Sequence, residues 1–359
     1  MSDDVEPPLV LREEDEPPMV RQAEPAPPRR PRPGFWEACL FTLGFWVVLA
    51  GTMMAIILPA IASVAFGGNG DAPRKPLDDP WVRTSLAWAM PGSYLAAFIY
   101  CLVVVRVVVG RTWTHDLGLT RLPPYHLILA LLALPGFMVL SEALAALLKP
   151  LDRAIFDLLG GGDVGDMNAE VTLMLQGYPA WFLVLAIGIG PGVVEEFWCR
   201  GYLGRGLIAR NGWIPGVVLT SLFFGVLHGW PPSYVLVTAS MGACLHFVYI
   251  ASRSLWAPMA MHLCNNSFAA LAASKAIATD GIDAAVQARG VPILVAALGL
   301  LLFCGLAMWH ARWTWPGETP GILVPPESSP DELTRNRIDG IYTIAAAFFC
   351  AVLLGLLLL

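Results

Sequence analysis

Long apolar runs separated by short polar stretches dominate this chain. Nine of them approach or exceed the roughly 20 residues that a helix needs to cross a bilayer, and they cover 35–66, 82–109, 126–148, 180–207, 213–230, 233–251, 255–274, 291–311 and 339–359. The runs are continuous, whereas strands of a membrane barrel alternate apolar and polar positions over about ten residues. The pattern therefore predicts an all-α polytopic membrane protein with about nine transmembrane helices.

Composition supports this class. Hydrophobic residues make up 56% of the chain and charged residues only 14%, whereas about a quarter of a soluble domain is charged. The seven cysteines lie in or beside apolar runs and show no CxxC spacing. We interpret them as small apolar side chains rather than as disulfides or metal ligands.

The pattern divides the chain into three regions. Residues 1–34 are rich in Pro, Glu and Arg, which predicts a disordered cytoplasmic tail. Residues 35–338 form the predicted transmembrane domain, and 339–359 form an additional C-terminal transmembrane helix. The expected partners are membrane lipid and a peptide or lipidated protein, with no nucleic acid.

Arginines gather at five places that alternate along the predicted helices. They are Arg29, Arg30 and Arg32; Arg106, Arg111 and Arg121; Arg205 and Arg210; Arg253; and Arg312, Arg335 and Arg337. The opposite loops include an acidic stretch with Asp152, Asp157, Asp163, Asp166 and Glu170. The positive-inside rule then places the N terminus in the cytoplasm, and we expect the membrane to be a bacterial cytoplasmic (inner) membrane.

The stretch "GPGVVEEFWCRG" places three ionisable side chains in an apolar setting. Ionisable residues at bilayer depth are costly and typically mark function. Glu196 and Arg200 are four residues apart on a helix, so they share a face and can form an ion pair. Glu195 lies about 100° around the helix and is free to face another direction. By itself, the ion pair is better interpreted as structural than as catalytic.

Two further pairs have the same helical spacing. Phe224 and His228 occur in "FFGVLH", and His262 and Asn266 occur in "MHLCNN". Either histidine alone could equally be a packing residue. Together with Glu195, however, these side chains suit hydrolysis: the carboxylate takes a proton from water, and an imidazole orients that water or binds a metal. His262 and Asn266 could donate hydrogen bonds to a developing oxyanion.

Counting residues from the turns predicts the relative depth of these groups. Glu195 lies sixteen residues before Asn211, and His228 lies seventeen after it, so both stand at nearly the same height. His262 lies only nine residues past Arg253. At about 1.5 Å per residue, this count places His262 roughly 10 Å lower than the other two, a gap that helix tilt or a kink at Pro258 could close.

With these residues in place, the chain resembles the CPBP family of CAAX proteases and bacteriocin-processing proteins, also called Abi, and in particular the Ras-converting CAAX endopeptidases. The family motif EExxxR matches Glu195 to Arg200, FxxxH matches Phe224 to His228, and HxxxN matches His262 to Asn266. Each motif alone is weak, but all three in order on consecutive apolar helices are specific. The resemblance covers residues 180–270, a quarter of the chain.

The resemblance implies an intramembrane endopeptidase of the eight-helix type, with its protease core at about 180–274. Glu195 and His228 would activate water, His262 and Asn266 would form the oxyanion site, and Arg200 would brace Glu196. Family members that act on prenylated proteins remove the last three residues of a lipidated C terminus. The resemblance also allows zinc or another divalent metal, for which Glu195, His228 and His262 would be the ligands, or a glutamate mechanism without metal.

Two other classes of function remain open from the sequence. A non-catalytic membrane scaffold or immunity protein of the same fold would tolerate loss of the Glu195 carboxylate. A proton-coupled transporter would also place carboxylates and histidines in the membrane. The chain shows no pair of internal repeats, which many such transporters have.

Overall fold

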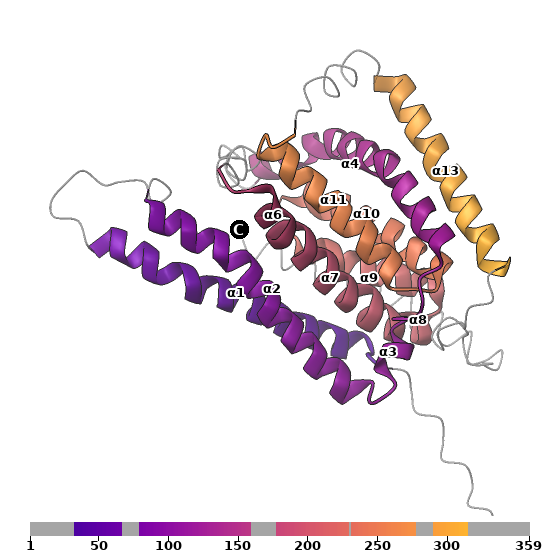
Figure 1. The fold of residues 1–359 in the computed structure, drawn as a ribbon, viewed down its shortest axis with the longest axis horizontal. Helices are drawn as coiled ribbons and strands as arrows, with labels where there is room; N and C mark the ends of the chain where they lie inside the picture. The colour runs from indigo at the N-terminus through magenta and orange to yellow at the C-terminus, as the bar shows by residue number, and fades with distance from the viewer. Residues whose placement is uncertain (1–31, 67–78, 159–176, 230, 278–289, 315–359) are drawn as a thin grey trace, which may run out of the picture. The chain divides into compact units, whose positions relative to one another are not determined.

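The computed structural model describes residues 32–66, 79–158, 177–229, 231–277 and 290–314. Within these ranges the chain forms helices joined by turns and contains no strand (Figure 1). The outer helices are α1 (Phe35–Phe66), α2 (Pro80–Val108), α4 (Pro124–Leu158) and α13 (Gly290–Thr314), with a short α3 (Trp113–Asp116) after α2. The all-α class predicted from the apolar runs is therefore confirmed.

The middle of the chain forms one continuous helical stretch and three further helices. The stretch comprises α6 (Ala180–Leu183), the π-helical segment η3 (Val184–Ile189), α7 (Gly190–Glu196), the π-helical segment η4 (Phe197–Gly204) and α8 (Arg205–Asn211). It is followed by α9 (Trp213–Leu227), α10 (Pro232–Ser252) and α11 (Trp256–Ala273).

Eight of the nine predicted spans are helices in the structure, and six helices among the described residues are long and apolar enough to cross a membrane. Two predicted spans are not among these six. Over 213–230, α9 has 15 residues, fewer than the roughly 20 of a straight crossing, and over 255–274, α11 has 18 residues but is less apolar than the six. The predicted tail at 1–34 and the helix at 339–359 lie outside the described residues, apart from the last few residues of the tail.

One boundary prediction was wrong. Asp152 and Asp157 were expected in an acidic loop, but α4 continues through Pro150 to Leu158 and contains both. Asp152 is buried there, and its carboxylate accepts hydrogen bonds from the backbone nitrogen (2.9 Å) and the hydroxyl (2.5 Å) of Ser233. The helix can bury this charge because the first turn of α10 offers it two hydrogen-bond donors.

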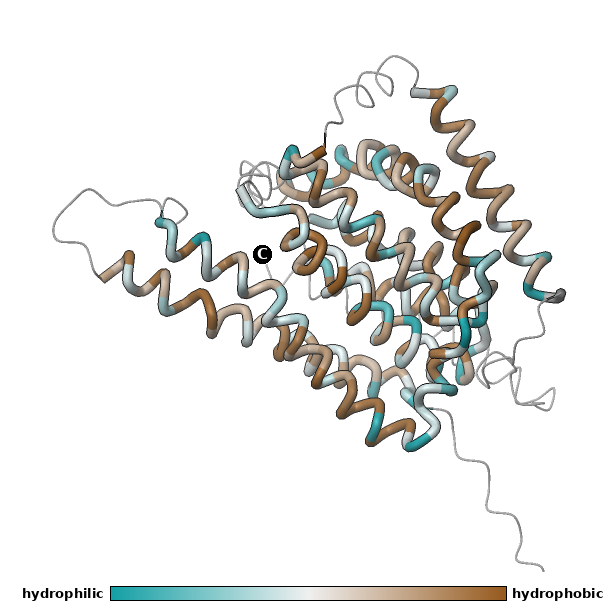
Figure 2. The backbone as a smooth tube through the Cα atoms, in the orientation of Figure 1, coloured by the Kyte–Doolittle hydropathy of each residue, from teal (hydrophilic) through white to brown (hydrophobic). Residues whose placement is uncertain are grey.

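The outer helices consist largely of apolar residues (Figure 2). In the most apolar 18 residues of each helix, only 11% of the residues are buried in α1 and 17% in α13, against 67% in the 180–211 stretch. Exposed large apolar side chains on α1, α2 and α13 include Leu40, Leu43, Val103, Val107, Leu302 and Phe303. A surface of this kind suits lipid rather than water, so the chain is an integral membrane protein whose 180–211 stretch lies at its centre.

Aromatic packing ties α1 to this central stretch. The ring of Phe45 stacks on that of Trp198, with centroids 5.5 Å apart, and Trp198 packs on Tyr202 at 4.8 Å. The indole nitrogen of Trp198 donates to the hydroxyl of Thr42 at 3.3 Å. Trp198 and Tyr202 are completely buried, so the first helix contributes directly to the core beside the candidate site.

Several of the arginine clusters noted in the sequence lie together at one end of the bundle. A guanidinium nitrogen of Arg205 lies 3.6 Å from a carboxylate oxygen of Asp116, and another donates to the carbonyl of Arg32 at 3.2 Å. The hydroxyl of Thr120 donates to the carbonyl of Arg253 at 2.9 Å. The segments before α1, after α2, around α8 and after α10 therefore meet, as their alternation along the sequence predicted.

Candidate active site

Adjacent carboxylates on α7 face different surroundings. Glu195 is 7% exposed and points toward a cavity, whereas Glu196 is completely buried among protein groups. The π-helical segments η3 and η4 flank the short α7 that carries them. Wider turns of this kind are frequent at functional sites, and here they bracket the catalytic candidate.

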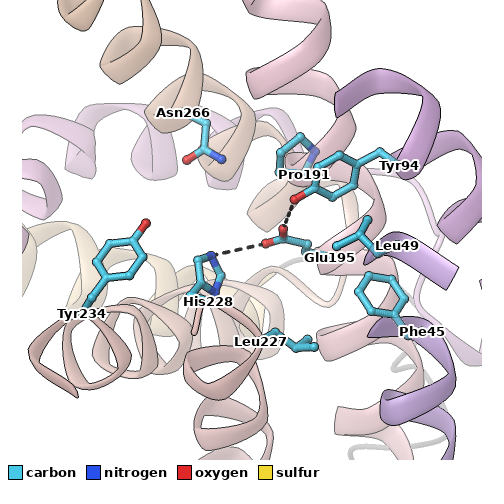
Figure 3. Close-up of a pocket in the computed structure, with 9 residues that line it drawn as sticks. All are labelled: Phe45, Leu49, Tyr94, Pro191, Glu195, Leu227, His228, Tyr234 and Asn266. Carbon is cyan, nitrogen blue, oxygen red and sulfur yellow. Dashed lines mark hydrogen bonds and ion pairs between the residues drawn. The ribbon is translucent and has the colours of Figure 1, made fainter. Parts of the chain in front are cut away.

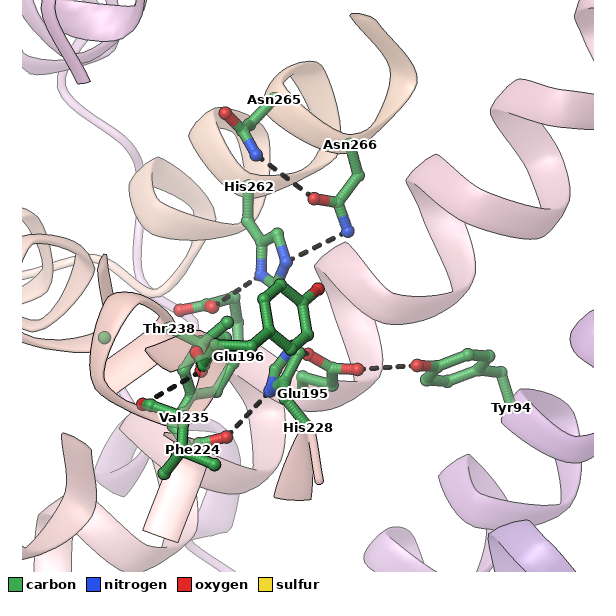
Figure 4. A network of polar contacts seen from close by, with 12 residues as sticks. Tyr94, Glu195, Glu196, Phe224, His228, Val235, Thr238, His262, Asn265 and Asn266 are labelled. Atoms are coloured by element: carbon green, nitrogen blue, oxygen red, sulfur yellow. Dashed lines mark hydrogen bonds and ion pairs between the residues drawn. The ribbon is translucent and has the colours of Figure 1, made fainter. Parts of the chain in front are cut away.

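Glu196 forms the centre of a buried polar network (Figure 4). Its Oε1 accepts from Nη1 of Arg200 at 2.6 Å and lies 2.8 Å from Nδ1 of His262. Arg200 also donates to the carbonyl of Gly242 at 2.9 Å, and its guanidinium lies 4.3 Å from the ring centre of Phe224. The predicted ion pair is therefore present, and Phe224 from the second motif packs on it.

The network continues from His262 to the edge of the cavity. Because Glu196 Oε1 is an acceptor, Nδ1 of His262 donates its proton to it, and Nε2 is left to accept. Asn266 Nδ2 lies 3.1 Å from that Nε2, and Asn265 Nδ2 donates to Asn266 Oδ1 at 3.2 Å. These contacts fix the amide of Asn266 with its nitrogen toward His262 and leave its second N–H for another partner.

Glu195 contacts a different set of groups. Its Oε1 accepts a hydrogen bond of 2.6 Å from the hydroxyl of Tyr94, and its Oε2 lies 3.7 Å from Nε2 of His228. His228 Nδ1 lies 2.7 Å from the carbonyl oxygen of Phe224, so that nitrogen carries the proton. A neutral His228 then presents the lone pair of Nε2 to Glu195 Oε2, which has no hydrogen-bond partner among the described residues.

A cavity of about 300 Å³ opens beside Glu195 and His228 (Figure 3). Its polar lining comes from Tyr94, Glu195, His228, Tyr234 and Asn266. Its apolar lining comes from Phe45, Leu49, Pro191 and Leu227. Five helices and the end of α9 at His228 thus converge on one cavity. In it, the acceptor atoms of Glu195 and His228 face the amide N–H of Asn266, and part of the lining between them is apolar.

All the predicted site residues come together, but their roles differ. Glu195, His228 and Asn266 line the cavity, whereas His262 is not among the described residues that line it. Both ring nitrogens of His262 are engaged by Glu196 and Asn266. In this arrangement His262 offers no N–H to an oxyanion and instead orients Asn266.

The simple residue count placed His262 too low, and the gap that it gave is closed in the structure. Residue counting assumed that the turns before α9 and α11 stand at the same height. However, Leu255 packs beside Gly201, ten residues before the first of these turns, because a Cβ atom at Gly201 would come within 3.2 Å of Leu255 Cδ2. In addition, a Cβ atom at Gly192 would come within 2.8 Å of Leu263 N. This close approach of α7 and α11 brings His262 level with Glu196.

Sequence reasoning missed two tyrosines of the cavity. Tyr94 on α2 and Tyr234 on α10 both line it, and Tyr94 binds Glu195 directly. Tyrosines within or near apolar helices most often mark the membrane interface. Neither belongs to a motif or has an ionisable neighbour at helical spacing that would have indicated a site.

The three residues named as a metal set do not form one as arranged. Within the residues that the structure describes, no three His, Cys, Asp or Glu side chains gather as a group that could hold a metal ion. His262 in particular has no free ring nitrogen to offer. The donor set therefore does not fit zinc without rearrangement, and we derive no catalytic step through a metal.

Two comparisons with known proteins find matches to this chain. Residues 177–268, which contain all three motifs, match the family described as type II CAAX prenyl endopeptidase Rce1-like. The chain is 23% identical over 230 residues to a Bacillus subtilis (strain 168) protein named "Putative membrane peptidase YdiL", covering 62% of this chain and 86% of that protein. No solved structure matches the chain significantly. The predicted resemblance to CPBP-type CAAX endopeptidases is confirmed, and it supports a membrane peptidase at the family level.

Proposed function

We propose that this chain is an intramembrane endopeptidase of the glutamate type, in which Glu195 and His228 activate the water that hydrolyses a peptide bond. The observation that carries the proposal is the pair formed by Glu195 Oε2 and His228 Nε2, which stand 3.7 Å apart at the cavity. Both are acceptors in the arrangement described. A water between them would donate one proton to each at ordinary hydrogen-bond distances of about 2.8 Å.

The remaining steps follow from the same geometry. The water oxygen, with a lone pair directed into the cavity, attacks the carbonyl carbon while Glu195 takes its proton. The second amide N–H of Asn266 donates to the oxyanion that forms. When the C–N bond breaks, the proton held by Glu195 passes to the leaving amine, and the products are a carboxylic acid, which keeps the second proton of the water, and an amine.

The substrate is a membrane-associated peptide or lipidated protein. The cavity places apolar walls formed by Phe45, Leu49 and Leu227 beside the acceptor pair. It lies among helices that cross the membrane, where a soluble chain has little access. The host membrane is a bacterial cytoplasmic membrane, with the N terminus in the cytoplasm, as the distribution of arginines favours.

The test uses the purified chain in detergent with a panel of prenylated, unlipidated and transmembrane peptides. Products of the wild type, Glu195→Gln and Glu142→Gln are identified by mass spectrometry, with and without a chelator. Glu142 is exposed on α4, outside the network, and so makes a matched control for the charge change. We expect the wild type and Glu142→Gln to cleave and Glu195→Gln to lose at least about 1,000-fold in rate.

Each other outcome has a defined meaning. Cleavage that survives Glu195→Gln rejects the mechanism, and a wild type that cleaves no peptide shifts the interpretation to a scaffold or immunity protein. Loss of cleavage with chelator, restored by zinc, replaces the glutamate type with a metal-dependent one.

A further inference from the structure

Tyr94 is bound to the catalytic carboxylate although it belongs to no motif. It lies on α2, outside the segment 177–268 that matches the peptidase family. Its hydroxyl donates to Glu195 Oε1 at 2.6 Å, across the cavity from Tyr234 and Asn266 (Figure 3). Hydrogen bonds of this length to a carboxylate are charge-assisted and are among the stronger ones in proteins.

This contact distinguishes the two oxygens of Glu195. With Oε1 held by Tyr94, the carboxylate plane is fixed and Oε2 is left facing His228 Nε2. A carboxylate without this contact would rotate about its terminal torsion, which is broad and roughly two-fold in free side chains. The tyrosine therefore determines which lone pair meets the water.

The packing of Tyr94 is as specific as its hydrogen bond. A Cβ atom at Gly190 would lie 3.2 Å from Cγ of Tyr94 and 3.3 Å from its Cβ. Such contacts are tighter than ordinary van der Waals distance, so the glycine allows the tyrosine ring to rest against the start of α7. Gly190 stands five residues before Glu195, so the ring meets α7 about one and a half turns from the carboxylate that its hydroxyl binds.

We propose that Tyr94 is a positioning residue for Glu195, and hence that α2 is part of the catalytic unit. The inference rests on the proposed function, because its consequence is a rate of peptide hydrolysis. It predicts that removal of one hydroxyl, with the ring kept, lowers turnover and leaves substrate binding unchanged.

The experiment compares Tyr94→Phe with Tyr100→Phe on whichever panel peptide the wild type cleaves best. Tyr100 lies on the same helix and also makes one hydrogen bond, 2.9 Å to the carbonyl of Phe41, but does not line the cavity. We expect kcat of Tyr94→Phe to fall about 10- to 100-fold, as for loss of a hydrogen bond to a charged group. KM should stay within about twofold, and Tyr100→Phe should keep the wild-type kcat.

A second variant keeps the test independent of the hydroxyl itself. Gly190→Ala displaces the Tyr94 ring by a few tenths of an ångström, so we expect a smaller loss of kcat. In the double variant with Tyr94→Phe the losses should not add, because both act through one contact. Fully additive losses would show that Gly190→Ala acts through general packing and would contradict the inference.

The outcomes separate this inference from the proposed function. If Glu195→Gln is inactive while Tyr94→Phe retains the wild-type kcat, the peptidase stands and the positioning role is rejected. If kcat and KM change equally in Tyr94→Phe and Tyr100→Phe, the hydroxyl is only structural and the role is again rejected. If the wild type cleaves none of the peptides, the proposed function fails and the role of Tyr94 fails with it.

Discussion

Single residues in this site act in two connected groups. Arg200, Glu196, His262 and Asn266 form a chain of hydrogen bonds that ends at the cavity, while Glu195 and His228 face each other within it. The buried charge of Glu196 is compensated by an arginine, and breaking such a pair is strongly destabilising. In the proposed mechanism, the first group therefore holds the donor in place, and the second activates the water.

This division predicts that Asn266 matters far more than its neighbour Asn265. Asn266→Ala removes the cavity-facing donor, and loss of one oxyanion donor costs about 100- to 1,000-fold in kcat. Asn265→Ala removes only a contact that steadies Asn266 Oδ1, so we expect a loss of less than about tenfold. Initial rates of peptide cleavage measure both.

Two results would contradict this assignment. Equal losses in the two variants would mean that the asparagine pair is structural. Unchanged turnover in Asn266→Ala would place the oxyanion elsewhere, and Tyr234 would be the next donor to test, because its side chain also lines the cavity.

At the scale of helices, small residues decide how closely the elements approach. Gly192 lets α7 meet the backbone of α11 at Leu263, and Gly216 does the same for α9 against Ile208 of α8. Small residues at helix interfaces are the usual means of close packing in membranes. Here they place the second and third motifs within reach of the first.

Gly192→Ala should therefore damage the site without touching any ionisable residue. The added methyl would meet backbone atoms of Leu263, which cannot move aside as a side chain does, so we expect a loss of about 1 to 3 kcal/mol in stability. Separation of α7 from α11 should also lengthen the 2.8 Å contact between His262 and Glu196 and lower kcat about tenfold or more. Unfolding in mixed micelles and peptide cleavage measure the two effects.

Gly299→Ala provides the control, because a Cβ atom at that position on α13 meets no atom within 4 Å. It should retain both stability and turnover. If Gly192→Ala behaves like Gly299→Ala, close packing of α7 and α11 is not what holds the site together.

Sequence patterns predicted the helices and the motif residues well because both leave local signals. Apolar length indicates a membrane helix, and spacing of four residues places Glu196 with Arg200 and His262 with Asn266 on shared faces. The level of His262 could not be counted, because the turn before α11 is not level with the turn before α9. Tyr94 could not be found either, because its contact with Glu195 joins residues 101 positions apart.

At the scale of the whole molecule, one end of the bundle gathers the arginines. Leu255 N, just before α11, donates to Gly118 O, which follows α3, so α11 begins at the same end as the segment after α2. α11 has 18 residues and is about 27 Å long at 1.5 Å per residue, close to the roughly 30 Å hydrocarbon thickness of a bilayer. Arg111 and Ala276, which follow α2 and α11 respectively, should therefore lie on opposite sides of the membrane.

The positive-inside rule assigns the arginine-rich end to the cytoplasm. In intact bacterial spheroplasts, a membrane-impermeant maleimide should then label Ala276→Cys, while Arg111→Cys should react only after lysis. Both positions are exposed, and the six described native cysteines are buried or half-buried, so the unmodified chain supplies the background. The reverse labelling pattern would mean that the arginine-rich end faces away from the cytoplasm. Equal labelling of both sites in intact cells would contradict the crossing itself, because it would place the two ends of α11 on one side of the bilayer.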